Sequence, residues 1–185
     1  FKDSVSKNMR LIYLTSKKYP AHTAHHIFIG QMARAFSSLL SRDLIFIVGD
    51  DHLNNFGYIN TLNLKLRLKR FRSLYYFLWI PFYVLRNKLK KDDIFFCDDM
   101  FLSSILILWR KLLRFNYKIC SEWHMLFNDW RDRLVALNSD YLITTSKHIK
   151  KLLVKKTGRD EKRILAVYGG VDLESYKTIS KEEAR

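Results

Sequence analysis

The stretch that decides the fold lies near the end of the chain, where residues 163 to 176 read RILAVYGGVDLESY. Its apolar, β-leaning run, Ile164–Tyr168, stops at the pair Gly169-Gly170, and Asp172 follows two residues later. Glycines at the end of a strand permit a tight turn and let the backbone approach a ligand or a second domain closely. The pattern predicts a strand that runs into a binding turn at Gly170 and Asp172.

Shorter apolar runs precede it and alternate with segments of helical periodicity. Their nearly continuous hydrophobicity is typical of strands that are buried on both faces of a parallel sheet. The sequence therefore predicts an α/β fold, a Rossmann-like parallel sheet with helices on both faces and ligands at the carboxyl ends of the strands. The other predicted strands are Leu11–Thr15, Leu44–Val48, Ile94–Cys97, Tyr117–Ser121 and Tyr141–Thr145, and the predicted helices are Ile29–Leu40, Phe101–Phe115 and Ser146–Gly158, with a loop at Asp51–Thr61.

Composition narrows the class of protein. A chain of 185 residues with 48% apolar residues is large enough for one folded domain, and its net charge of +15 predicts an anionic partner. Cys97 and Cys120 lie in apolar runs, which indicates reduced core thiols of a cytosolic protein. No apolar run reaches the roughly 18–20 residues that span a bilayer. Met9 is the expected native start, with residues 1–8 as a tag or upstream tail.

The segment at the end resembles the "(I/V)-P-N-G-V-D-x-x-x-F" sequence that closes the N-terminal domain of GT-B glycosyltransferases of the family 4 type, with Gly169 in place of Asn and Tyr176 in place of Phe. The resemblance implies that residues 9–176 form the acceptor-side domain of a retaining enzyme. Residues 177–185 would begin the linker to an absent C-terminal donor domain, so this chain alone is expected to be inactive. The implied substrates are a nucleotide-sugar donor, as co-substrate with no further cofactor, and a lipid-linked or glycan acceptor at the membrane face.

Polar residues at a second strand end carry the catalytic hypothesis. The segment Tyr117–His124 resembles the family's strand that ends in "T-x-H-(D/N)", which implies a catalytic role for His124 beside the donor sugar. A histidine just past a buried strand also faces the ligand cleft of such a sheet, although a structural histidine beside Trp123 is the alternative. Glu122 is a candidate for binding acceptor hydroxyls, with a surface or capping carboxylate as the alternative.

Asp98 and Asp99 follow the strand Ile94–Cys97, in a segment that resembles the family's "D-(V/I)-(V/I)-H-x-(H/N)-x" without its histidine. We expect them to bind acceptor or to cap the helix that begins near Met100. Adjacent carboxylates also suggest a metal site. Neighbours on an extended chain point apart, however, and GT-B enzymes usually need no metal, so no metal is predicted.

The loop after the first strand departs most clearly from the family. Relatives carry a Gly-Gly pair where this chain has Thr23 and Ala24, and glycines there let helix amides meet the donor diphosphate. Thr23, Ala24 and His25 remain substrate-binding candidates, with a metal cluster of nearby histidines as the alternative for His25. Ser146 matches the family's "(V/A)-x-(S/T)-S" and is assigned to substrate binding or to a helix N-cap.

The middle of the chain is basic, with no acidic residue between Asp51 and Asp92. Cations flank the apolar run Leu74–Leu85, which Pro81 is expected to break or kink. This pattern predicts docking of a cytoplasmic, peripheral protein on the anionic inner membrane face. A core helix with a solvated basic end is one alternative, and a non-catalytic module that docks on membrane or nucleic acid is another; nucleic acid is not the predicted partner. The predicted membrane-binding residues are Lys65, Arg67, Lys69, Arg70, Arg72, Arg86 and Lys88.

Overall fold

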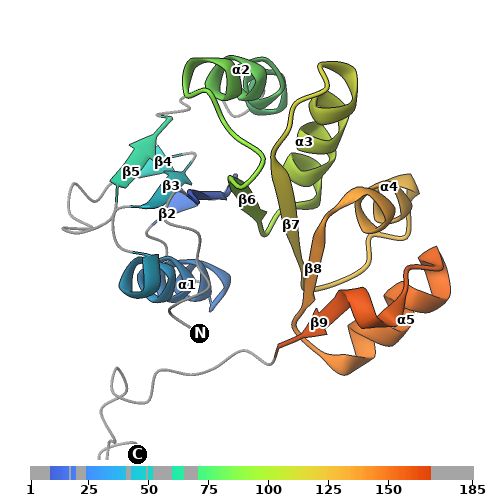
Figure 1. Cartoon of the computed structure of the whole chain (residues 1–185). Helices are drawn as coiled ribbons and strands as arrows, with labels where there is room; N and C mark the ends of the chain where they lie inside the picture. The colour runs from blue at the N-terminus through green and yellow to red at the C-terminus, as the bar shows by residue number, and fades with distance from the viewer. Residues whose placement is uncertain are drawn as a thin grey trace, which may run out of the picture.

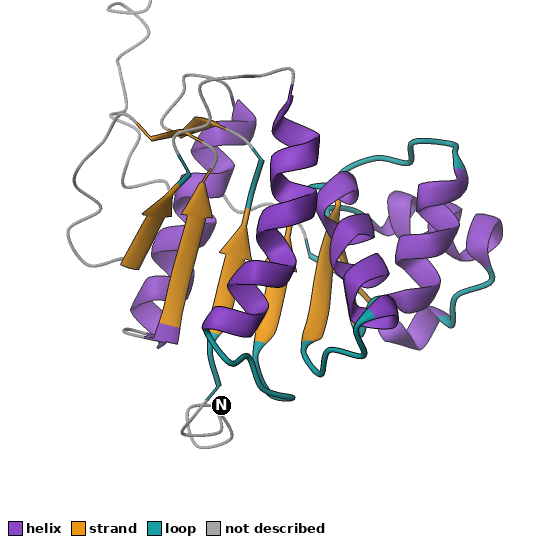
Figure 2. Ribbon diagram, turned by 90° about the horizontal axis from the view of Figure 1, so that it is seen from above, coloured by secondary structure: helices purple, strands orange, loops and turns teal. Residues whose placement is uncertain are grey.

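A seven-stranded, all-parallel sheet forms the centre of the molecule (Figure 1). In the computed structural model, the described residues are 9–16, 18–19, 24–40, 43–48, 50–51, 60–64 and 71–167. The strand arrows point the same way (Figure 2), which confirms the predicted Rossmann-like parallel sheet. In spatial order the strands are β5 (Asn60–Asn63), β3 (Leu44–Val48), β1 (Leu11–Leu14), β6 (Ile94–Cys97), β7 (Lys118–Trp123), β8 (Tyr141–Thr144) and β9 (Ile164–Ala166).

All six predicted strands are present, two with the predicted ends and four with ends that differ by one or two residues. The sequence missed the edge strand β5, and the predicted loop Asp51–Thr61 is wrong at its end, because Asn60 and Thr61 belong to that strand. The sequence of β5 is Asn-Thr-Leu-Asn, and such a polar strand has no apolar run to reveal it. Two further strands of two residues each, β2 (Lys18–Tyr19) and β4 (Asp50–Asp51), pair separately.

Five α-helices are described. Helix α1 lies on one face of the sheet, and α2 and α3 cover the opposite face (Figure 1). Helix α4 was not predicted, because it carries only a weak apolar pattern. None of the described helices is both long and apolar enough to cross a membrane. Their bounds are α1 (Ala24–Leu40), α2 (Arg72–Arg86), α3 (Met100–Leu112), α4 (Trp130–Asn138) and α5 (Lys147–Thr157).

The two faces of the sheet carry separate cores. Side chains alternate across a strand, so Leu11 and Tyr13 of β1 pack toward α1 while Ile12 and Leu14 pack toward α2 and α3. The α1 face is rich in aromatic contacts, among them Tyr13 against Phe96, with ring centroids 5.0 Å apart. Cys97 and Cys120 are buried free thiols, as predicted. This alternation decides which polar residues meet at the ends of the strands.

Of the break or kink expected at Pro81, the break is absent, because α2 continues through the proline to Arg86. A proline has no N–H to donate to the carbonyl four residues earlier, which here belongs to Phe77. The indole Nε1 of Trp109 donates to that carbonyl oxygen at 2.7 Å. Helix α3 therefore supplies the hydrogen bond that the proline removes.

The ends of α3 and α5 test the remaining helix predictions. The Ser146 Oγ accepts from the Ile149 N–H at 3.2 Å, and Gly158, at φ 73°, ends α5 in the left-handed region as predicted. The predicted burial of α3 holds only for its first half, because Leu108 and Leu112 are exposed.

Candidate functional site

The candidate site lies at the carboxyl edge of the sheet, at its topological switch point. β1 lies between β3 and β6, so the chain winds outward in both directions from this strand. Ligands of doubly wound sheets bind in the crevice outside the carboxyl ends of the strands at such a point. The residues that leave the sheet there are Thr15 and Ser16 after β1, Asp98 and Asp99 after β6, and His124 after β7.

A row of three polar side chains crosses this edge on the α1 face. Leu14 pairs with Cys97, and Cys97 pairs with Ser121, so the next residues, Thr15, Asp98 and Glu122, stand at one level. All three are buried, and the Thr15 Oγ1 donates to the Asp98 Oδ2 at 3.3 Å. The row places two carboxyl groups side by side on neighbouring strands.

Burial of Glu122 corrects the alternative that it is a surface or capping carboxylate, because only 4% of the residue is exposed. Residues 118 to 123 alternate between the two cores, and Glu122 falls on the α1 face beside Cys120. A buried carboxyl group needs a polar partner, and the side chain of His124 lies beside this one.

His124 stands over this row at the mouth of the crevice. Its Nε2 lies 3.7 Å from the Glu122 Oε2, and its ring packs edge-on against Phe28 of α1, with centroids 5.4 Å apart. The contact with Glu122 raises the pKa of His124 above its usual 6.5, although partial burial acts in the opposite direction. The pair thus favours the protonated form of an imidazole at the carboxyl edge of the sheet.

We expect the substitution Glu122→Gln to lower the pKa of His124, because it removes the negative charge that stabilises the imidazolium. The folded-state pKa is raised, so the pair stabilises the fold below the unfolded value of about 6.5, and this contribution is lost as pH rises through the folded pKa. NMR titration of the His124 ring measures the shift. The variant Glu161→Gln, at an exposed position in the turn between α5 and β9, is the control and leaves the pKa unchanged. An identical His124 titration in Glu122→Gln and wild type would contradict the pairing.

Tyr13 lies beneath the row and is fully buried. Burial, together with the charges of Asp98 and Glu122, raises the pKa of its phenol well above 10, so the hydroxyl stays neutral. Its Oη has no hydrogen-bond partner among the described residues. The sequence analysis missed Tyr13 and Thr15 because only the pairing of β1 with β6 brings them beside Asp98.

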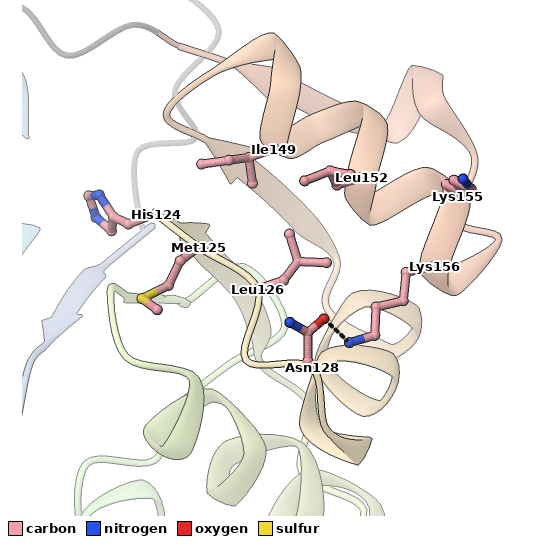
Figure 3. A pocket seen from close by; sticks show the side chains of 8 residues that line it. All are labelled: His124, Met125, Leu126, Asn128, Ile149, Leu152, Lys155 and Lys156. Carbon is pink, nitrogen blue, oxygen red and sulfur yellow. Dashed lines mark hydrogen bonds between the residues drawn. The ribbon is translucent and has the colours of Figure 1, made fainter.

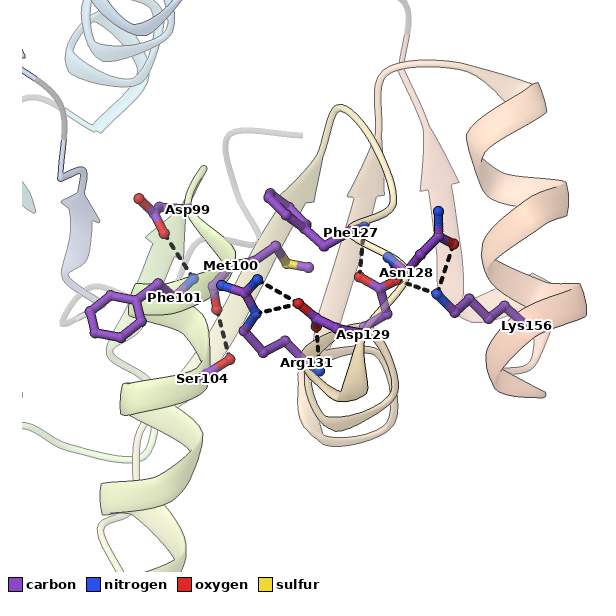
Figure 4. Close-up of polar contacts among 10 residues, drawn as sticks. Asp99, Met100, Phe101, Ser104, Phe127, Asn128, Asp129, Arg131 and Lys156 are labelled. Carbon is purple, nitrogen blue, oxygen red and sulfur yellow. Dashed lines mark hydrogen bonds and ion pairs between the residues drawn. The ribbon is translucent and has the colours of Figure 1, made fainter. Parts of the chain in front are cut away.

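Asp99 acts structurally in this arrangement. Its Oδ1 accepts from the N–H of Phe101 at 2.8 Å, and so caps α3 (Figure 4), while its Oδ2 accepts from the Ser16 hydroxyl. The contact ties the end of β1 to the start of α3. The capping role expected of Asp99 is therefore confirmed, and its two contacts hold the end of β1 and the start of α3 together beside the crevice.

A groove of about 600 Å³ begins at His124 and runs along α5 (Figure 3). Its lining is apolar in the middle, where Leu126, Ile149 and Leu152 meet, and cationic at the far end. There Lys155 is exposed and makes no ion pair with any described residue. The volume suits a small-molecule ligand, and the lining suits one with an apolar body and an anionic group.

The loop from β7 to α4 forms one wall of the groove and is held by Asp132. This buried carboxylate accepts from the N–H groups of Phe127 and Asn128 at 3.1 and 2.8 Å, and from the Lys156 Nζ at 2.7 Å (Figure 4). Asn128 has φ 62°, a conformation that asparagine tolerates better than most residues. The sequence analysis missed this wall, because a run of hydrogen bonds around one carboxylate leaves no periodic signal.

The remaining predicted residues fall in several places. Ala24 and His25 lie in the first turn of α1, whose residue Phe28 contacts His124. Ser146 lies at the end of β8, and its hydroxyl caps α5. Among the described residues, no group of three or more histidine, cysteine or acidic side chains is placed to hold a metal ion. Outside the described residues lie Thr23, Gly170 and Asp172, and also the predicted membrane-binding residues Lys65, Arg67, Lys69 and Arg70.

Fold and edge geometry together define a Rossmann-like α/β domain with polar residues at its switch point. The fold matches that of the N-terminal half of GT-B glycosyltransferases. Solved structures with this fold include the lipopolysaccharide outer core galactosyltransferase WaaB in its apo form (TM-score 0.62, 17% identity, 91% of this chain and 47% of that one). Anabaena HepE with UDP and glucose gives a TM-score of 0.65 at 14% identity, over 95% of this chain and 48% of that one. Sucrose-phosphate synthase from Thermosynechococcus elongatus gives 0.66 at 11% identity, over 95% and 52%.

The chain thus spans about half the length of the solved structures that it matches. No protein-family model and no curated protein sequence matches it. At these identities the likeness is one of fold.

Proposed function

We propose that this chain is the acceptor-side domain of a retaining glycosyltransferase that moves a sugar from a nucleotide-sugar donor to a lipid-linked or glycan acceptor. The observation that carries the proposal is the pair His124–Glu122 beside buried Asp98 at the carboxyl edge of the sheet. The fold supports it, because the structural neighbours above are a galactosyltransferase, a protein with bound UDP and glucose, and a sucrose-phosphate synthase.

In this proposal each group of the site has a separate task. The imidazole of His124 contacts the donor sugar, and Glu122 holds that imidazole in its orientation and protonation state. Asp98 lies in the row beside Glu122, and in this proposal its carboxylate accepts hydrogen bonds from sugar hydroxyls. The nucleotide binds mainly to a second domain beyond this sequence, and the nucleotide sugar is a co-substrate with no separate cofactor.

The groove next to His124 is the proposed acceptor site. Its apolar middle, at Leu126 and Ile149, fits the body of a lipid-linked acceptor, and Lys155 at its end fits a phosphate. A groove that starts at the proposed catalytic residue brings one end of the acceptor to the point of transfer. The further candidates Thr23, His25, Gly170 and Asp172 remain predictions from the resemblance.

The test uses the chain extended through the residues that follow it in its natural gene, with a panel of nucleotide sugars and lipid-phosphate or glycan acceptors. We expect transfer by the extended protein and none by the 185-residue chain alone. The variant Leu152→Glu places a charge in the groove and should raise the acceptor KM about tenfold with less change in kcat. The control is Leu165→Glu, at an exposed site on β9 outside the groove lining.

Sugar transfer with an unchanged acceptor KM in Leu152→Glu would remove the groove from the acceptor site. An extended protein that consumes no nucleotide sugar, yet still binds membranes or nucleic acid, would favour the alternative of a non-catalytic basic module.

A further inference from the structure

Helix α2 exposes large apolar side chains on the side that faces away from the sheet. Leu74, Leu78, Phe82 and Leu85 are 54%, 59%, 58% and 63% exposed, and Tyr75 is exposed between them. At about 100° per residue these five side chains fall within an arc about 100° wide on one side of the helix. We name them the outer stripe.

The opposite side of the same helix is already used for folding. Tyr76, Ile80, Tyr83 and Val84 are buried in the core that α2 shares with α3. A surface helix of a globular protein normally carries polar residues on its outer side, and a helix that is apolar on both sides is usually covered there as well. The outer stripe is therefore an apolar surface that the described part of the chain leaves exposed, continuous along most of a helix about 22 Å long.

Cations extend from the C-terminal end of the stripe. Arg86 closes the helix, and exposed lysines at 88, 90 and 91 follow it. None of these four residues forms an ion pair with a described residue, while the neighbouring carboxylate of Asp92 contacts Lys118 at 3.9 Å. The charge beside the stripe is thus positive and available to an anionic partner.

We propose that the outer stripe inserts into the interfacial region of an anionic bilayer, with α2 parallel to the membrane plane and the cations of residues 86–91 on the lipid headgroups. An apolar helix face with basic residues beside it is the chemistry that such surfaces bind. A second copy of this chain fits less well, because it would bring the same positive charges together. Nucleic acid would also fit less well, because it would bind the cations but would not bury the apolar side chains of the outer stripe.

This orientation has a consequence for the rest of the molecule. The Tyr76 Oη donates to the Thr15 carbonyl oxygen at 3.1 Å, which ties the first turns of α2 to the carboxyl end of β1. One end of the stripe therefore lies at the edge of the sheet that carries the candidate site. Docking through the outer stripe therefore holds the carboxyl edge of the sheet close to the membrane surface. This consequence does not depend on the proposed glycosyltransferase function.

Sedimentation with vesicles of phosphatidylglycerol and phosphatidylcholine, against vesicles of phosphatidylcholine alone, tests the proposal on the 185-residue chain. We expect preferential binding to the anionic vesicles and at least tenfold weaker binding for the double variant Leu78→Ser, Phe82→Ser. Replacing Lys90 and Lys91 by Gln should weaken binding about fivefold for each cation. The matched control, Leu137→Ser with Leu165→Ser, removes two exposed leucines elsewhere and should bind as wild type.

A conservative replacement separates insertion from loss of folding. In Phe82→Trp we expect quenching of the added fluorescence by bilayers with brominated acyl chains, and little quenching of the tryptophan added by the control Leu165→Trp. Wild-type binding by the serine double variant, or equal quenching at both sites, would overturn the proposal. So would tighter binding to oligonucleotides than to vesicles, or a solution dimer that the double variant converts to a monomer.

Discussion

Asp93→Ala is expected to lower the free energy of unfolding by about 3–5 kcal/mol, the effect of removing one partner of a buried ion pair. The carboxylate of Asp93 is fully buried, and the guanidinium of Arg10 meets it at 2.6 Å through one nitrogen and at 3.1 Å through Nε. The backbone N–H groups of Arg10 and Lys90 also donate to it, at 3.1 and 2.7 Å. Loss of this carboxylate leaves several donors without their acceptor and frees the start of β1 from the turn before β6.

The neighbouring residue provides a matched control. Asp92 is 62% exposed in its side chain and contacts Lys118 at 3.9 Å, so Asp92→Ala should change the unfolding free energy by less than about 0.5 kcal/mol. Urea unfolding of both variants at neutral pH measures the difference. Equal effects of the two substitutions would show that the network around Asp93 contributes little.

Acid should reduce the difference between wild type and Asp93→Ala. Burial alone would raise the pKa of Asp93, but the hydrogen bonds from Arg10 and from the backbone outweigh it and hold the pKa below 3.8. A lowered folded-state pKa means that the stabilisation is present above pH about 4 and is lost as the pH falls through the folded pKa.

His124→Ala should reduce the turnover of the extended enzyme at least a hundredfold, which is the lower end of what a positioned proton-transfer or charge-stabilising group contributes. The fold should persist, because His124 lies at the rim of the sheet with 30% of its side chain exposed. The measurement pairs kcat with the thermal midpoint of unfolding. The control Leu137→Ala changes an exposed residue of α4 outside the groove lining and should keep turnover within a few-fold of wild type.

Glu122→Gln distinguishes a catalytic from a structural role of the pair. If Glu122 acts by holding the proton on His124, turnover falls and the pH dependence of kcat moves to lower pH together with the His124 titration. Wild-type turnover in His124→Ala would make His124 a structural residue, while sugar transfer itself would still support the proposed function.

Much of the fold could be read from local patterns. Runs such as Leu44–Val48 and Ile94–Cys97 are apolar at nearly every position. A strand with helices on both faces of its sheet buries all its side chains, so polar residues are disfavoured on either face. Ser146 and Gly158 bracket α5 because a hydroxyl N-cap and a left-handed C-terminal residue are local requirements. The position of His124 after a buried strand also followed from the order of elements alone.

The contacts that make a site from these elements depended on tertiary structure. Thr15, Asp98 and Glu122 are far apart in the sequence, and only the register of three parallel strands puts them in one row. The uninterrupted course of α2 depends on a hydrogen bond from Trp109, which lies on another helix and leaves no mark near Pro81.

What the sequence by itself determined is six of the strands, several of the helices and many of the polar residues at their ends, since periodicity and capping act over a few neighbouring residues. Tertiary structure alone decided that Glu122 is buried against His124 and that Leu78 and Phe82 face outward. The sequence of an apolar run does not show whether one side or both sides of its helix pack against other elements of the fold. The difference lies in which elements pack against it, and that packing is set by residues distant in the chain.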